Sequence, residues 1–147
     1  IYTMTPDFAQ KMFKVFHELE TLTKDKTNEY YKSNYADINS VLGQIKPVLK
    51  RHGLYILQIF LFDKLCTFLA DETGNTFPKF PETTEDAKQI SEIHGIKIES
   101  NEPMKKGSEI TFYRRYALVA LFGLESKDDD GVATAKNNNY NNQNFPI

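Results

Sequence analysis

The chain has 147 residues, of which 40% are hydrophobic, 13% aromatic and 26% charged, and its formal net charge is −2. This length and composition predict one folded domain with a real core and exclude an intrinsically disordered chain. The longest apolar runs are too short to cross a bilayer, and the single cysteine, Cys66, cannot form an internal disulfide, so we expect a reducing, cytoplasmic setting without a membrane anchor.

A first helix is predicted from Thr5 to about Leu22. Thr5 is a suitable N-cap, and Pro6 suits the first helical position because its missing N–H would have no helical partner there. Apolar residues then recur at helical spacing, which predicts one buried face.

A second helix is predicted to begin after Asp37, as its N-cap, and to stop at Gly53. Pro47 interrupts this pattern, because proline removes a helical hydrogen bond to the fourth residue back. We therefore expect a kink or a break near Gly43.

The pattern then changes to short β-rich runs. Three strands are expected at residues 54–62, 65–70 and 76–80, and together they predict an antiparallel meander. A short helix at residues 83–94, ending at Gly95, is expected to lead into a strand with alternating Ile96 and Ile98.

The last predicted helix runs from Glu109 to about Leu124, with Ser108 as its N-cap. The composition then becomes Asn-rich, so we expect a domain over residues 1–131 and a low-complexity tail over residues 132–147. The predicted fold class is α+β, with an antiparallel three- to four-stranded β-meander packed on the long helix and the N-terminal helices alongside.

Several catalytic motifs are absent from the sequence. There is no Walker-type phosphate loop, so ATP-driven recombination or unwinding is not expected. The three histidines and Cys66 lack metal-ligand spacing. The run Asp128-Asp129-Asp130 is the densest carboxylate cluster, and a solvated loop is the favoured interpretation of it.

Charge is unevenly distributed along the chain. Residues 61–103 carry 4 basic and 9 acidic side chains, whereas the segment from Met104 to Leu118 has four cations against the single acid Glu109. A local basic patch on a mildly acidic protein is therefore expected, and phosphate binding depends on such local fields more than on net charge.

Two blocks of sequence resemble the ERF family of phage and prophage single-strand annealing proteins. The first block is Tyr31-Lys32-Ser33-Asn34-Tyr35-Ala36-Asp37, continuing through Lys46-Pro47 to Gly53-Leu54 and Gln58. The second is Gly107-Ser108-Glu109-Ile110-Thr111-Phe112-Tyr113-Arg114-Arg115-Tyr116, continuing through Gly123 to Asp128-Asp129-Asp130-Gly131. The resemblance spans roughly residues 29–131. It departs from the family's pattern at Lys105-Lys106, which stand where a short link is usual.

The resemblance implies a protein that binds single-stranded DNA and anneals complementary strands in phage-type homologous recombination, without ATP, a cofactor or enzymatic catalysis. It also implies a homo-oligomer, in the form of a ring or a helical filament, in the cytoplasm of a bacterial host. A partner exonuclease or a host single-strand-binding protein would be further partners.

The physical chemistry of the same residues also predicts a phosphate site. Thr111 precedes Arg114 and Arg115 by three and four residues, so on a helix their side chains share one side. Ser108 and the first amides of the helix would favour an anion, with Lys105 and Lys106 just upstream. The alternative is that the two arginines pair with carboxylates such as Asp128.

An aromatic and basic loop precedes the second predicted helix. Lys32 is expected to contact phosphates, and the rings of Tyr31 and Tyr35 to stack on bases without reading sequence. The alternative for the tyrosines is that they fasten the loop to the core.

Two other classes of function stay open at this point. One is a divalent-metal nuclease that uses Asp128, Asp129 or Asp130 together with Asp71 or Glu72. The other is an oligomeric interaction module that does not contact DNA.

Overall fold

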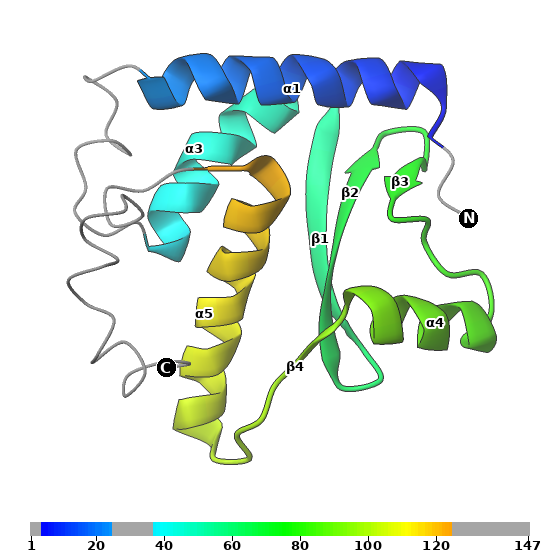
Figure 1. The fold of residues 1–147 in the computed structure, drawn as a ribbon, viewed down its shortest axis with the longest axis vertical. Coiled ribbons are helices and arrows are strands. Elements are labelled where there is room, and N and C mark those ends of the chain that lie inside the picture. Colours follow the sequence, from blue (N-terminus) through cyan, green and yellow to red (C-terminus); the bar gives the residue numbers. More distant parts are fainter. Residues whose placement is uncertain (1–3, 25–36, 125–147) are drawn as a thin grey trace.

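The computed structural model describes residues 4–24 and 37–124, which form four helices and one antiparallel sheet of four strands (Figure 1). In chain order the elements are α1 (Pro6–Lys24), α3 (Ile38–Arg51), β1 (Leu54–Leu61), β2 (Lys64–Asp71), β3 (Thr76–Phe77), α4 (Thr84–His94), β4 (Ile96–Lys97) and α5 (Pro103–Phe122). The predicted mixture of helices and an antiparallel sheet is confirmed.

The predicted N-caps of the first two helices are in place. Thr5 Oγ1 accepts a hydrogen bond from the Phe8 amide at 3.2 Å, and the Asp37 carboxylate accepts one from the Ser40 amide at 2.7 Å. Of the kink or break expected near Gly43, the break does not occur, because α3 is continuous through Pro47. Both residues are exposed, so the carbonyl that Pro47 leaves without a helical donor can bind water.

β2 is the central strand of the sheet. β1 pairs with it along its whole length, from Leu54↔Asp71 to Leu61↔Lys64. The short strands β3 and β4 both pair with β2 as well, β3 at its end and β4 at its beginning. The third strand is shorter than predicted, because Pro78 follows it directly and has no N–H to extend the ladder.

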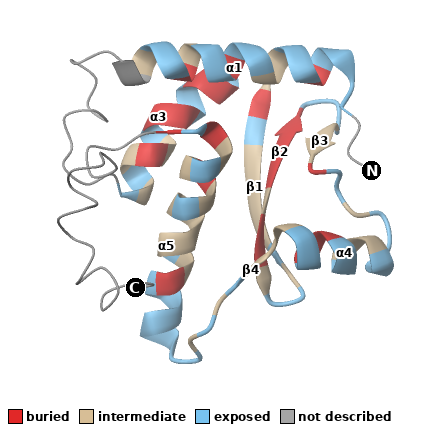
Figure 2. Cartoon of the chain, viewed as in Figure 1, coloured by how far each residue is buried: buried red, intermediate tan, exposed pale blue. Residues whose placement is uncertain are grey.

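The two faces of the sheet contribute to different hydrophobic clusters. On one face, Leu54, Ile56 and Leu69 join a large core made with α1, α3 and α5. On the other, Cys66 and Phe68 pack with Ile90 of α4 in a smaller cluster. This division explains why β2 is buried along most of its length (Figure 2).

Helix α1 lies across the end of the sheet where β1 begins and β2 ends (Figure 1). Lys11 Nζ fixes it there, 3.1 Å from Glu72 Oε1 and 4.0 Å from Asp71 Oδ2. Farther along α1, Glu18 forms an ion pair with Arg51 at the end of α3, and this bond, opposed by burial, lowers the pKa of the Glu18 carboxyl. Within residues 4–24 and 37–124, no helix is long and apolar enough to cross a membrane.

Of the last two described helices, α4 begins where it was predicted to begin and α5 does not. α4 begins at Thr84 as expected, because Thr83 Oγ1 accepts a hydrogen bond from the Asp86 amide at 3.0 Å. The prediction that Ser108 is the N-cap of α5 is wrong. The helix begins at Pro103, which suits a first helical position, and its first backbone bond runs from the Lys106 amide to the Glu102 carbonyl at 2.7 Å.

Candidate functional site

Four of the five cations predicted to bind phosphate lie on α5. Lys105 and Lys106 are exposed in its first turn, which is the positive end of the helix dipole. Lys105 Nζ lies 3.4 Å from a Glu102 carboxylate oxygen, and both side chains are mostly exposed, so this ion pair restrains the lysine weakly. An anion bound at this turn would relieve the unfavourable placement of two cations.

Thr111, Arg114 and Arg115 follow one another on α5 as predicted, but their side chains have different contacts. The hydroxyl of Thr111 donates to the Gly107 carbonyl at 3.1 Å and is exposed. Arg114 is half-buried, and its Nε donates to Gln58 Oε1 on β1 at 3.1 Å. The guanidinium carbon of Arg115 lies 5.9 Å from the centre of the Phe112 ring, which is within cation–π range.

Ser108 has a different position in the helix from the one predicted. It is an exposed residue in the second turn of α5, so the amides that follow it lie inside the helix. The amides without a helical partner are those of Met104 and Lys105, since Pro103 has none and Lys106 is already bonded. The end of the helix that attracts anions is therefore at the two lysines.

A carboxylate beside this site holds the loop that precedes α5. Glu109 is 1% exposed, and its two oxygens accept hydrogen bonds from the Glu99 and Ser100 amides at 2.8 and 2.9 Å. Sequence reasoning gave Glu109 no such role. The signal was available, because Glu109 is the single acid among the cations of that segment.

Tyr113 and Tyr116 line the same helix. Burial, the main cause, and the nearby Glu109 carboxylate raise the pKa of the Tyr113 hydroxyl, so this tyrosine is a neutral, half-buried packing residue. The Tyr116 ring is 51% exposed and lies 6.3 Å, centre to centre, from the Phe112 ring. Packing therefore accounts for Tyr113 better than for Tyr116.

The remaining predicted contacts lie outside the described residues. These are Lys32, Tyr31 and Tyr35 in the loop before α3, and the carboxylate run Asp128-Asp129-Asp130. The pairing of Arg114 or Arg115 with Asp128 and the Asn-rich tail are outside them too.

The carboxylates that a nuclease would need near β2 have structural partners. Asp71 is 1% exposed and accepts hydrogen bonds from the Thr73 and Asn75 amides, both at 2.9 Å, and from both side chains. Glu72 binds Lys11. No group of histidine, cysteine and carboxylate side chains in the described ranges could hold a metal ion.

Cys66 and His94 have the properties of packed residues. Burial raises the pKa of the Cys66 thiol and lowers the pKa of the His94 imidazole, so both groups are held neutral at pH 7. Neither is a candidate nucleophile or metal ligand on this geometry.

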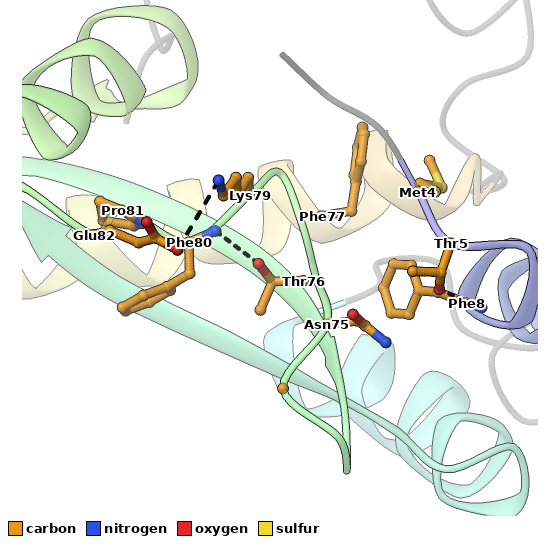
Figure 3. A pocket seen from close by; sticks show the side chains of 11 residues that line it. Met4, Thr5, Phe8, Asn75, Thr76, Phe77, Lys79, Phe80, Pro81 and Glu82 are labelled. Atoms are coloured by element: carbon orange, nitrogen blue, oxygen red, sulfur yellow. Dashed lines mark hydrogen bonds and ion pairs between the residues drawn. The ribbon is translucent and has the colours of Figure 1, made fainter.

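A pocket of about 310 Å³ lies between the beginning of α1 and the chain after β3 (Figure 3). Phe8, Phe77 and Phe80 contribute rings to it, and Lys79 pairs with Glu82 at its rim, 4.0 Å apart. The surrounding segment is the acidic part of the chain, so this pocket does not favour a phosphate.

Comparison with known proteins agrees with the resemblance seen in the sequence. The model of the ERF superfamily matches residues 8–146, nearly the whole chain. No curated protein and no solved structure matches it. The match covers all the described elements except the first two residues of α1, and it includes every cation described above, so the chain belongs to the ERF superfamily.

Proposed function

We propose that this protein binds single-stranded DNA and anneals complementary strands in phage-type recombination, without ATP and without catalysis. The observation that carries the proposal is the family match over residues 8–146. Annealing needs no external energy, because each base-pair step that forms is favourable. This agrees with a sequence that contains no Walker-type loop.

In this proposal the exposed part of α5 follows the phosphate backbone. Lys105 and Lys106 contact phosphates at the free amides of the first turn, while Arg115, Thr111 and Ser108 continue the contact along the helix. Neutralising phosphates releases counterions, so binding falls steeply as salt increases. Arg114 contributes charge from a position that its hydrogen bond to Gln58 fixes.

The loop before α3 completes the proposed site, with Lys32 on a phosphate and Tyr31 and Tyr35 against bases. The protein acts as a homo-oligomer, as a ring or a helical filament, so that many short contacts add along one strand. A nuclease that produces single strands and a host single-strand-binding protein are the proposed partners.

The fold supports the proposal at one further point. The family resemblance implies a β-meander with a long helix packed on it, and we propose this arrangement here. The two hydrogen bonds between Gln58 of β1 and Arg114 of α5 support it.

The test is fluorescence annealing of complementary oligonucleotides with Arg114→Ala combined with Arg115→Ala. Each lost phosphate contact weakens binding, so we expect annealing at moderate salt to slow by about tenfold or more. Gln58→Ala is the matched control, because it also removes the bond that Arg114 Nε donates, together with the two bonds from Gln58 Nε2, but keeps both guanidinium groups.

Three results separate the proposal from its alternatives. If the double variant folds and oligomerises normally yet anneals as fast as wild type, the arginines are not part of the site. Magnesium-dependent cleavage of the oligonucleotides, lost in chelator, would identify a nuclease instead. If a gel shift detects no binding at either low or moderate salt, the protein is an interaction module and the proposal fails.

A further inference from the structure

The β1–β2 hairpin has an unusual turn. Leu61 pairs with Lys64, so Phe62 and Asp63 form a two-residue turn, and both have positive φ, 49° and 65°. This is the pattern of a type I′ turn, which favours asparagine, aspartate and glycine. Asp63 fits that preference, but Phe62 does not, since a bulky side chain is disfavoured in the left-handed region.

Core packing does not explain this phenylalanine. Phe62 is 55% exposed, and Phe60, two residues earlier, is 46% exposed. Neither ring belongs to the two hydrophobic clusters, although Leu61 between them packs against one. The hairpin therefore presents two aromatic rings to solvent, one of them at a backbone position where asparagine would be more stable.

Two lysines lie directly opposite each other beside this turn. Lys64 of β2 and Lys97 of β4 are Cα partners in the antiparallel ladder, so their side chains leave the same face of the sheet. Like charges placed opposite each other destabilise a sheet unless an anion lies between them. Within the described ranges neither ammonium group has an ion-pair partner. Asp63 carries the one carboxylate of the two-residue turn, and it forms no ion pair with either lysine.

The hairpin tip lies at the same end of the molecule as the beginning of α5, and opposite the end that α1 covers (Figure 1). The lysines of the first turn of α5 therefore belong to the same end as Lys64, Lys97 and the two rings. Rings that stack on bases, beside cations that follow phosphates, are the composition of a single-strand binding surface.

We propose that the hairpin tip is a second contact for the single strand, in which the Phe62 ring stacks on a base and Lys64 and Lys97 bind neighbouring phosphates. The proposal rests on the proposed function and extends it to residues outside both blocks of the family resemblance. Stacking on a ring face is tolerant of sequence, which annealing of arbitrary strands requires.

The chain contains no tryptophan, so a single introduced indole reports on one position. We expect oligo(dT) to quench the fluorescence of the Phe62→Trp variant over the concentration range in which a gel shift detects binding. Phe13→Trp is the matched control, because Phe13 is 72% exposed on α1, at the opposite end, and its indole should not respond. A gel shift without quenching at position 62 would overturn the hairpin contact and leave the proposed function intact, whereas no gel shift at all would defeat both.

A second experiment separates DNA contact from folding. Phe62→Asn should raise the thermal midpoint, because asparagine suits the turn, while lowering the affinity for oligo(dT) by about 5- to 100-fold. Phe13→Ala should leave the affinity unchanged. Replacing Lys64 and Lys97 together by glutamine should make the salt dependence shallower by about 1.4 in log–log slope.

The hairpin could instead be a contact between copies of this chain, and light scattering decides between the two. If Phe62→Asn reduces the mass of the oligomer but leaves the affinity of each subunit for oligo(dT) unchanged, the tip is a protein–protein contact and the proposal is wrong. We expect the opposite result, an unchanged mass with weaker DNA binding.

Discussion

Gln58 on β1 and Arg114 on α5 are joined by two hydrogen bonds. Nε of Arg114 donates to Gln58 Oε1 at 3.1 Å, and Gln58 Nε2 donates to the carbonyl oxygen of Arg114 at 3.2 Å. The same Nε2 also donates to Thr67 Oγ1 on β2 at 3.1 Å. One amide group thus connects the helix to two strands, and Arg114 has a structural role in addition to its proposed contact with phosphate.

Arg114→Ala should therefore lower the free energy of unfolding, by about 1–2 kcal/mol, because it leaves the half-buried Gln58 oxygen without this donor. Lys106→Ala, at an exposed position on the same helix, should change it by less than about 0.5 kcal/mol. Urea denaturation followed by circular dichroism measures both. Equal losses in the two variants would show that the bond to Gln58 contributes nothing.

The parts of the fold that could be predicted are those whose causes are local in sequence. Asp37 and Thr83 cap helices with their own side chains, and the spacing of apolar residues marks the buried faces. The bond between Gln58 and Arg114 could not be predicted, since it depends on how a strand and a helix 56 residues apart in sequence are placed. The local composition of the sequence predicted the cations of α5, but it did not predict the residues that they contact.

Glu109→Ala should destabilise the protein and release the loop before α5. Its buried carboxylate accepts the Glu99 and Ser100 amides, and hydrogen bonds to a charged acceptor contribute about 1.5–3 kcal/mol. Urea denaturation measures the loss, and hydrogen exchange should show faster exchange at these two amides. The amides of β1 and β2 are the internal control. Unchanged protection of Glu99 and Ser100 would show that another contact holds the loop.

Asp71 should make stability depend on pH at the acidic end. Burial alone would raise the pKa of its carboxyl, but hydrogen bonds from Asn75 and Thr73 outweigh burial and hold the pKa below its usual value of 3.8. A lowered pKa in the folded state means that the carboxylate stabilises the fold above about pH 4, and that this contribution is lost as the pH falls through the folded value.

Asp71→Asn should accordingly be less stable than wild type at pH 7, and the difference should shrink as the pH falls below about 4. Urea midpoints between pH 7 and about pH 2.5 measure this, with the exposed Glu92→Gln as the control. A gap between variant and wild type that stays constant across this range would assign the loss to packing of the turn and not to the charge.

The beginning of α5 shows why a sequence signal can be placed wrongly. Gly107-Ser108 before an apolar stripe has the composition of a helix start, yet the chain is already helical there. Pro103 at the first helical position and the loop bound by Glu109 allow an earlier start. This changes the proposed phosphate site, because the amides that attract anions lie at the two lysines and not after Ser108.

Gly107→Ala tests this earlier start. Gly107 lies in the second turn of the helix, and a Cβ there would meet nothing within 4 Å, so alanine should stabilise the protein by about 0.5–1 kcal/mol. Ser108→Ala should cost nothing, whereas Asp37→Ala, which removes a real N-cap, should cost about 1 kcal/mol. Thermal and urea unfolding of the three variants measure these differences. If Ser108→Ala instead destabilised the protein as much as Asp37→Ala, the helix would begin at Ser108, and the phosphate contact would return to the amides that follow it.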